Sequence, residues 1–413
     1  MSRTVITESP SATKTVWTAS GTAWAPANAP PARGSAPLFA PAARAPATCP
    51  SPPKQPAPSA SAVPWASQRY DQSRLHALAD GHGIVVAVID SGVDARNPQL
   101  RDAVQPGPDQ LDGGSSTLDC VGHGTAVAGI IAARPTPATK FYGLAPAATI
   151  LALRVTEQTE AENGTTTGRR GTPTALANAI RDAVTRHAQV INLSLVSYTD
   201  DPAIREAVQY AVDNDVVLVA AVGNNKELGN KTPYPAAYDG VLGVGSITPE
   251  GQRAATSQTG SYVDLVAPGT QILTTATPDG LTTMEGTSFA APFVSATAAL
   301  LRQYRPDLTA TQITAHLKAT ADGGQSGDGY GAGLLNPYRA LTEWTDASPK
   351  PAPQSLHQPP TRPNPTAESA ATRRTLTWAL TGLTAIAASA LLAAVIPRAR
   401  RRNWRPGLLN PKP

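Results

Sequence analysis

Four polar residues stand at glycine-containing turns beside apolar runs, and their side chains are of the types that acyl-transfer chemistry needs: Asp90, His123, Asn224 and Ser288. Asp90 ends the apolar run 84–89, so its carboxylate is expected at the carboxyl end of a strand, where open α/β sheets place their sites. His123 lies between two glycines at the start of a run of small residues. This pattern indicates an imidazole presented at the beginning of a helix.

Asn224 and Ser288 supply the two other functional groups. Asn224 follows the apolar run 216–222, so its amide is placed to donate to a developing oxyanion, an interaction worth about 3 kcal/mol of transition-state stabilisation. Ser288 stands at a glycine turn before an Ala-rich helix, which gives a nucleophile an exposed hydroxyl near helix-terminal N–H groups. Each residue alone also fits an ordinary turn or helix cap. Because the four occur together in the order Asp, His, Asn, Ser, the set favours nucleophilic serine chemistry.

The elements that must position these residues follow a pattern that predicts an α/β fold. Short continuous apolar runs are typical of strands that are covered on both faces. Helical stretches alternate with them, which indicates a mostly parallel central sheet. The strands are expected at 84–89, 150–155, 190–195, 216–222, 241–244 and 263–266, and the clearest helices at 174–187 and 202–214.

Proline content separates one folded block from the rest of the 413 residues. Thirteen of the 40 prolines fall before Ala66. Residues 1–63 also lack the apolar periodicity that a core requires, so we expect a disordered extension there. A single large domain is expected at 64–345, followed by a proline-rich linker at 346–375.

The segment 376–396 has 21 residues without a charge, which is enough to cross a bilayer core about 30 Å thick. Five arginines follow this segment within 397–413, and two, Arg373 and Arg374, stand just before it. This bias predicts a cytoplasmic C-terminal tail and a central domain outside the membrane. Residues 1–63 show no pattern of a secretory signal peptide, so export is expected to use another signal or another start.

Charge and cysteine content limit other classes of protein. The net charge of +4 is small for this length, which disfavours binding of nucleic acid by a basic surface. Two cysteines, Cys49 and Cys120, are too few for a Cys-rich zinc site or a disulfide scaffold. One disulfide or two free thiols remain possible. Serine acyl transfer needs no metal or cofactor, and none is expected.

The segments around the four residues jointly resemble the subtilisin-like serine proteases over about residues 81–341, in the Asp, His, Ser order of that family. Weaker stretches match in the same order at 143–146, 191–195, 266–269 and 331–336. The resemblance implies a subtilisin-like three-layer fold and serine endopeptidase activity. It implies that Ser288 is the nucleophile, His123 the general base and Asp90 the group that orients the imidazole. Asn224 and the Ser288 N–H would then form the oxyanion hole.

One subfamily fits better than the rest, the mycosins, which are membrane-anchored subtilases of type VII secretion systems. Three features resemble it: the segment 119–133, a cysteine in a proline-rich N-terminal extension, and a C-terminal span with a basic tail. The resemblance implies an extension that wraps around the domain and is pinned by a disulfide between Cys49 and Cys120. It also implies substrates exported by such a system, contact with its membrane complex, and a single-pass protein with an extracytoplasmic catalytic domain.

The sequence departs from the family pattern at the expected substrate-binding segment. Ser194 and Leu195 continue with Val196 and Ser197, where many subtilases have two glycines that contact the substrate backbone. We therefore expect Ser194, Leu195 and Val196 to bind a restricted set of substrates. No calcium site is recognisable. Two other hypotheses stay open, a structural subunit of the secretion complex with secondary proteolysis and a general degradative protease.

Overall fold

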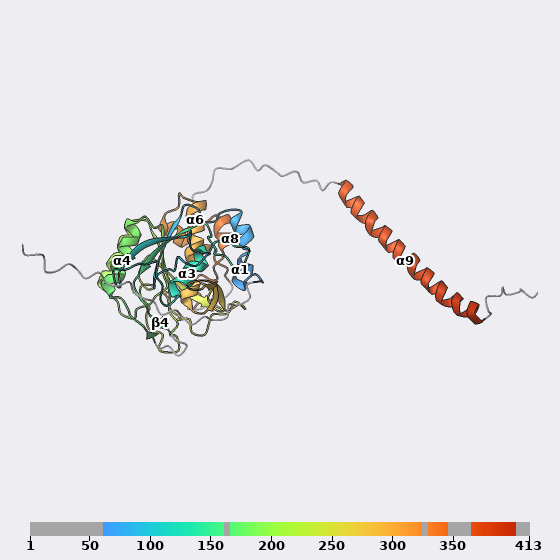
Figure 1. Cartoon of the computed structure of the whole chain (residues 1–413). Helices are drawn as coiled ribbons and strands as arrows, with labels where there is room; N and C mark the ends of the chain where they lie inside the picture. Colours follow the sequence, from blue (N-terminus) through green and yellow to red (C-terminus); the bar gives the residue numbers. More distant parts are fainter. Residues whose placement is uncertain (1–60, 161–165, 324–328, 346–364, 402–413) are drawn as a thin grey trace, which may run out of the picture. The chain divides into compact units, whose positions relative to one another are not determined.

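The computed structural model describes residues 61–160, 166–323, 329–345 and 365–401. The chain forms two compact units, residues 1–345 and 346–413, each of which is described by itself (Figure 1). The expected extension at 1–63 lies almost wholly outside the described residues, as does most of the expected linker.

A sheet of seven strands, every neighbouring pair parallel, runs through the first unit in the order β2-β3-β1-β6-β7-β8-β9. The mostly parallel central sheet expected from the sequence is thereby confirmed. Its strands are β1 (Val85–Asp90), β2 (Val104–Asp109), β3 (Thr149–Arg154), β6 (Val190–Leu193), β7 (Val217–Ala221), β8 (Val241–Ile247) and β9 (Leu265–Pro268). The β6 strand is shorter than expected, so Ser194 and Leu195 lie in the connection that follows it.

The sequence pattern missed strand β2, which contains Pro106 and Pro108. Proline cannot donate a backbone hydrogen bond, so it is tolerated in strands chiefly at the edge of a sheet. β2 is an edge strand and pairs only with β3. Its position explains how this sequence forms a strand without the apolar run used to find the others.

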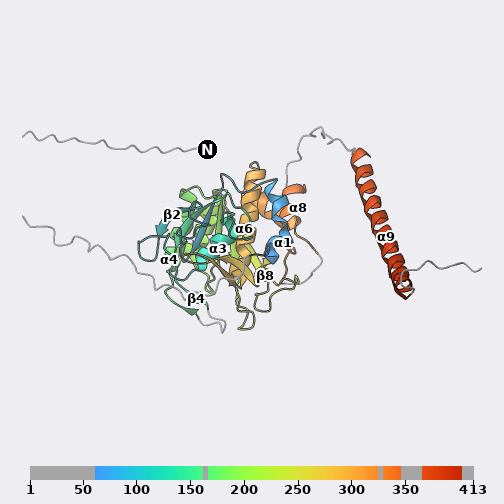
Figure 2. The same cartoon turned by 45° about the vertical axis from the view of Figure 1, so that its right-hand side comes forward.

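Helices cover both faces of the sheet, which confirms the three-layer fold (Figure 2). Alternate residues of β1 point to opposite faces, with Val86 and Val88 in one buried cluster and Ala87 and Ile89 in the other. The first cluster includes the inner sides of α3 (His123–Ala132) and α6 (Thr287–Tyr304), and the second those of α4 (Pro173–Thr185) and α5 (Pro202–Asp213). The two-sided cover accounts for the continuous apolar strands.

Smaller elements complete the first unit. Before the sheet come α1 (Trp65–Tyr70) and α2 (Gln72–His76), and after α6 come α7 (Ala310–Ala319) and α8 (Pro337–Thr342). Two hairpins are formed by β4 (Thr159–Glu160) with β5 (Thr166–Thr167) and by β10 (Ile272–Thr275) with β11 (Leu281–Met284). A Cβ atom on Gly129 of α3 would lie 2.1 Å from Thr275 Oγ1, so the small residues of α3 allow close packing on β10.

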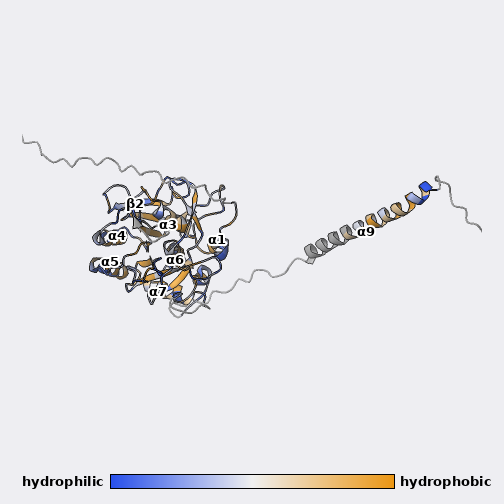
Figure 3. Ribbon diagram, turned by 90° about the horizontal axis from the view of Figure 1, so that it is seen from below, coloured by the Kyte–Doolittle hydropathy of each residue, from blue (hydrophilic) through white to orange (hydrophobic). Residues whose placement is uncertain are grey.

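The second unit contains helix α9 (Pro365–Arg401). Within the described residues, its stretch Ala379–Arg401 is the one helix long and apolar enough to cross a membrane, with a mean hydropathy of 2.1 over its most apolar 18 residues. Figure 3 shows this apolar stretch ending in a hydrophilic segment, where Arg398, Arg400 and Arg401 lie. The helix begins inside the segment expected to be linker, because Pro365 suits a first helical turn and the Ala-rich residues after it favour helix.

Candidate active site

Asp90 and His123 form the central pair of the site. Asp90 is the last residue of β1 and is 1% exposed, and His123 is the first residue of α3. The His123 Nδ1 atom lies 2.7 Å from Asp90 Oδ1, which also accepts a hydrogen bond of 2.7 Å from the Ser91 N–H. Because an ionised carboxylate can only accept, this contact places the proton of a neutral imidazole on Nδ1 and leaves Nε2 as the basic nitrogen.

The glycines around His123 have a steric reason. Gly122 adopts a φ of +82°, which favours glycine. A Cβ atom on Gly124 would lie 2.1 Å from the Gly92 carbonyl oxygen and 3.0 Å from Asp90 Cβ. The start of α3 can therefore approach the end of β1 only without a side chain at Gly124, and this approach brings His123 to Asp90.

Ser288 is the second residue of α6 and faces the same cleft as the Asp90–His123 pair. The cleft has a volume of about 680 Å³ and is lined by Asp90, His123, Asn224 and Ser288 together. The neighbouring Phe289 ring packs against the imidazole, with 5.1 Å between ring centroids. The structure thus brings together the four residues expected from the sequence.

Thr287 determines how the Asn224 amide is oriented. Its backbone N–H and its hydroxyl both donate to Asn224 Oδ1, at 2.9 and 3.1 Å. Gly286 has a φ of +127°, and a Cβ atom there would lie 3.0 Å from Asn224 Nδ2. Since Oδ1 faces Thr287, the Nδ2 group is the end of the amide that can donate toward an oxyanion in the cleft.

Ser194 connects the substrate-binding segment to the nucleophile. Its hydroxyl donates to the Ser288 carbonyl oxygen at 2.7 Å, and Ser288 Oγ donates to the Ser194 carbonyl oxygen at 3.3 Å. Behind it, the Asn192 Nδ2 group donates to Ser194 Oγ, and the Ser295 hydroxyl donates to Asn192 Oδ1. All of these side chains except that of Ser288 are buried, so the chain of hydrogen bonds fixes β6 against α6 beneath the nucleophile.

Leu195 and Val196 also line the cleft, as expected for a substrate-binding segment. Further apolar residues line the cleft, and sequence reasoning did not identify them; they include Val155, Leu176 and Ile204. These three are 3%, 7% and 3% exposed. Their pattern in the sequence is that of core residues, so no signal distinguishes them from the interior.

Asp119 is a second acidic residue at the site, and its role was not expected. Its carboxylate is 1% exposed and accepts hydrogen bonds from the Ser91 hydroxyl, from the backbone N–H groups of Val121, Gly122 and Thr125, and from the Thr125 hydroxyl. Burial raises the pKa of the Asp119 carboxyl, while the hydrogen bonds from Thr125 and Gly122 act in the opposite direction. Asp119 thereby connects the Asp90 turn to the first turn of α3. Its position four residues before His123 is the signal that could have indicated it.

The cysteine prediction falls partly outside the described residues. Cys120 follows Asp119 directly, whereas Cys49 lies in the undescribed segment 1–60. No free cysteine occurs in the part of the chain that the structure describes. In the same part of the chain, no three His, Cys, Asp or Glu side chains are grouped so that they could hold a metal ion.

Comparison with known proteins gives consistent similarities. The family model described as the subtilase family matches residues 81–335. Mycosin-1 of Mycolicibacterium smegmatis is 34% identical over 346 residues, which cover 72% of this chain and 76% of the relative. Thermitase of Thermoactinomyces vulgaris is 35% identical over 284 residues, or 67% of this chain and 97% of the relative. The solved structure described as a serine protease MycP1, an essential component of the type VII (ESX-1) secretion system, aligns with a TM-score of 0.60 at 34% identity. It covers 71% of this chain and 92% of that one.

Proposed function

Because the chain belongs to the subtilase family of serine endopeptidases, we propose that it is anchored in the cell membrane and cleaves proteins exported by a type VII secretion system. The main support for the proposed proteolysis is the 2.7 Å contact between His123 Nδ1 and Asp90 Oδ1, in a cleft that Ser288 and Asn224 also line. The similarity to mycosin-1 and to MycP1 supports the secretion role.

In the proposed mechanism, Ser288 Oγ attacks the carbonyl carbon of the scissile peptide bond while His123 Nε2 accepts its proton. The oxyanion that forms is bound by Asn224 Nδ2 and the Ser288 N–H. The first N–H groups of an α-helix have no intrahelical acceptor, so the Ser288 N–H at the start of α6 suits this role. His123 then protonates the leaving amine, which leaves an acyl-enzyme on Ser288. Water activated by the same imidazole hydrolyses the ester and restores the enzyme.

We place the peptidase domain at 64–345 and the membrane segment at 376–396. Support comes from the apolar stretch Ala379–Arg401, which ends in arginines. Arginine enrichment on one side of a span is typical of its cytoplasmic side, so the catalytic domain would be extracytoplasmic. Reporter fusions test this topology: a fusion after the tail should report a cytoplasmic position, and an extracytoplasmic signal from it would refute the orientation.

We also propose a disulfide between Cys49 and Cys120. Cys120 is not a free thiol, and Cys49 is the only other cysteine of the sequence. Closing a loop of about 70 residues would contribute roughly 4 kcal/mol to stability in the chain-entropy model. The bond would hold the N-terminal extension three residues from His123 and limit access to the cleft. Alkylation of the natively exported protein followed by mass spectrometry tests the bond, and two modified thiols would refute it.

A structural role in the secretion complex is the second candidate function, and the description of MycP1 as an essential component of such a system favours it. The experiment compares exported proteins by N-terminal mapping in wild-type, deletion and Ser288→Ala cells. We expect Ser288→Ala to abolish specific processing while secretion persists. If processing persists in that variant, the protease proposal is wrong. If deletion of the protein stops secretion but Ser288→Ala cells still secrete, the protein has a structural role in addition to proteolysis.

A further inference from the structure

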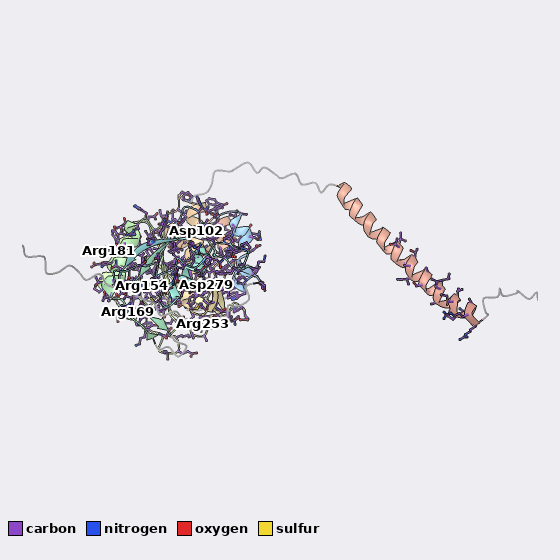
Figure 4. The ribbon with its side chains drawn as sticks, in the orientation of Figure 1. Asp102, Arg154, Arg169, Arg181, Arg253 and Asp279 are labelled. Carbon is purple, nitrogen blue, oxygen red and sulfur yellow. The ribbon has the colours of Figure 1, made fainter. Side chains whose placement is uncertain are left out.

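Two neighbouring arginines beside the cleft differ in their surroundings. Arg169 is paired with Asp112 and Glu157, with nitrogen to oxygen distances of 2.6 and 2.7 Å. Both carboxylates also contact the buried Arg154, so this cluster is internally paired. Figure 4 labels Arg154 and Arg169. Arg170 is exposed and has no carboxylate partner among the residues that the structure describes. The Arg170 guanidinium is therefore available to an external anion.

The position of Arg170 relates it to the bound substrate. Its guanidinium donates to the Val196 carbonyl oxygen at 2.7 Å, and both residues line the cleft. Val196 is two residues beyond Ser194, whose hydroxyl binds the Ser288 carbonyl oxygen. An extended substrate that runs beside this segment advances about 3.3 Å per residue. In a substrate extended along this segment from Ser288, a residue two to three positions from the scissile bond would lie beside Arg170.

The charges of the cleft favour a carboxylate at that position. Arg170 is the only arginine or lysine among the described residues that line the cleft. The acidic lining residues are Asp90, which is buried against His123, and Glu285, which is exposed. Only one of the five guanidinium N–H groups is needed to bind Val196, so others can donate to a side-chain carboxylate in the fork geometry that arginine offers.

We propose that Arg170 makes the enzyme select substrates with an aspartate or glutamate two to three residues from the cleaved bond. This inference rests on the proposed peptidase function and names a property of its substrates. Since the arginine is exposed, the ion pair is screened by salt and the preference is moderate. We expect a preference of about three- to tenfold in kcat/KM.

The test uses the purified full chain in detergent and a set of isomeric peptides around one cleavable bond. A single glutamate is moved through the four positions before that bond and the three after it, so the net charge stays constant, and a matched set carries glutamine. Mass spectrometry identifies the cleaved bond. We expect wild-type protein to cleave the peptide with glutamate two or three residues from the bond about three- to tenfold faster than its glutamine counterpart, with a smaller ratio at high salt.

Substitutions test whether Arg170 is responsible for the preference for glutamate. Arg170→Gln should bring the glutamate to glutamine ratio near one, and Arg170→Lys should retain part of it. Arg181→Gln is the matched control, because it removes one positive charge from α4 outside the cleft (Figure 4) and should keep the wild-type ratio. The proposal is wrong if wild-type protein shows no preference, if Arg170→Gln keeps it, or if Arg170→Gln slows all peptides equally. Failure of wild-type protein to cleave any peptide, or equal cleavage by Ser288→Ala, would instead refute the peptidase function.

Discussion

Replacing Thr287 by valine tests whether a buried residue orients the oxyanion donor. Thr287 is fully buried. Its hydroxyl donates to Asn224 Oδ1 at 3.1 Å and accepts the Gly223 N–H at 3.0 Å, while its backbone N–H donates to Asn224 Oδ1 at 2.9 Å. Thr287→Val keeps the shape and the backbone hydrogen bond and removes the two hydrogen bonds of the hydroxyl.

The expected losses in stability and in activity differ in size. The Gly223 N–H loses its acceptor in a buried position, and a buried unsatisfied group costs about 1–3 kcal/mol. The free energy of unfolding should therefore fall by about 2 kcal/mol. Asn224 loses one of the hydrogen bonds that hold its amide, worth about 1 kcal/mol, so kcat should fall about fivefold. KM should stay nearly constant, because the oxyanion forms only in the transition state.

The assay is a double-mutant cycle with a peptide substrate. It measures kcat and KM for wild type, Thr287→Val, Asn224→Ala and the double variant, with active-site titration to correct for unfolded protein. Asn224→Ala should reduce kcat by about 10²- to 10³-fold. If Thr287 acts through Asn224, the double variant should be within about twofold of Asn224→Ala. Thr297→Val is the matched control, since that buried hydroxyl binds only the Phe293 carbonyl oxygen within α6.

Three results would refute this reasoning. A further fivefold loss in the double variant would mean that Thr287 acts independently of Asn224. A raised KM at unchanged kcat would mean that it contributes to uniform binding of substrate instead of to the transition state. A comparable loss of kcat in Thr297→Val would assign the effect to general loosening of α6.

Three further predictions concern the surroundings of the site. Gly124→Ala should reduce kcat/KM by at least 100-fold, measured with a peptide substrate, because its Cβ would collide with the Gly92 carbonyl oxygen and displace His123. Asp119→Ala should lower the free energy of unfolding in urea by about 3 kcal/mol, since it leaves several buried donors without an acceptor. Hydrogen bonds and charge from Arg169 lower the pKa of Asp112 to about 2. A lowered carboxyl pKa contributes stability that is present above the unfolded value near 4 and is lost as pH falls toward 2. Thermal unfolding of Asp112→Asn should therefore depend less on pH between about 4 and 2 than that of the wild type.

The sequence allowed the sheet to be predicted because its strands are buried on both faces and therefore appear as continuous apolar runs. The start of β1 differs by one residue from the prediction and that of β8 by none. Strand β2 was not predicted from the sequence. Its prolines are tolerated because the strand lies at the edge of the sheet, and a sequence does not show which strand lies at an edge. The start of α9 was not predicted either, because proline is typical of linkers although it is also a good first residue of a helix.

Some residues of the site could likewise be predicted from local patterns in the sequence, whereas others could not. His123 and Ser288 stand beside glycines that mark turns, so local chemistry identified them. Asp119 has local contacts with Val121, Gly122 and Thr125. Its hydrogen bond with Ser91 and that of Thr287 with Asn224 join residues far apart in the chain. No spacing rule indicates these hydrogen bonds. They appear only when strand order brings the turns after separate strands to one edge of the sheet.

This arrangement also determines where substrate preference can change without loss of the catalytic geometry. The hydrogen bonds from Asn192 and Ser194 beneath Ser288 are buried, so a change there leaves a buried donor or acceptor without a partner and costs about 1–3 kcal/mol. Val196 is only half-buried and Arg170 is exposed, so substitution at either residue leaves no buried polar group unsatisfied. The two residues lie next to each other in the cleft lining and are joined by one hydrogen bond. Substrate preference can therefore change at Val196 and Arg170 while the buried hydrogen bonds keep the nucleophile in position.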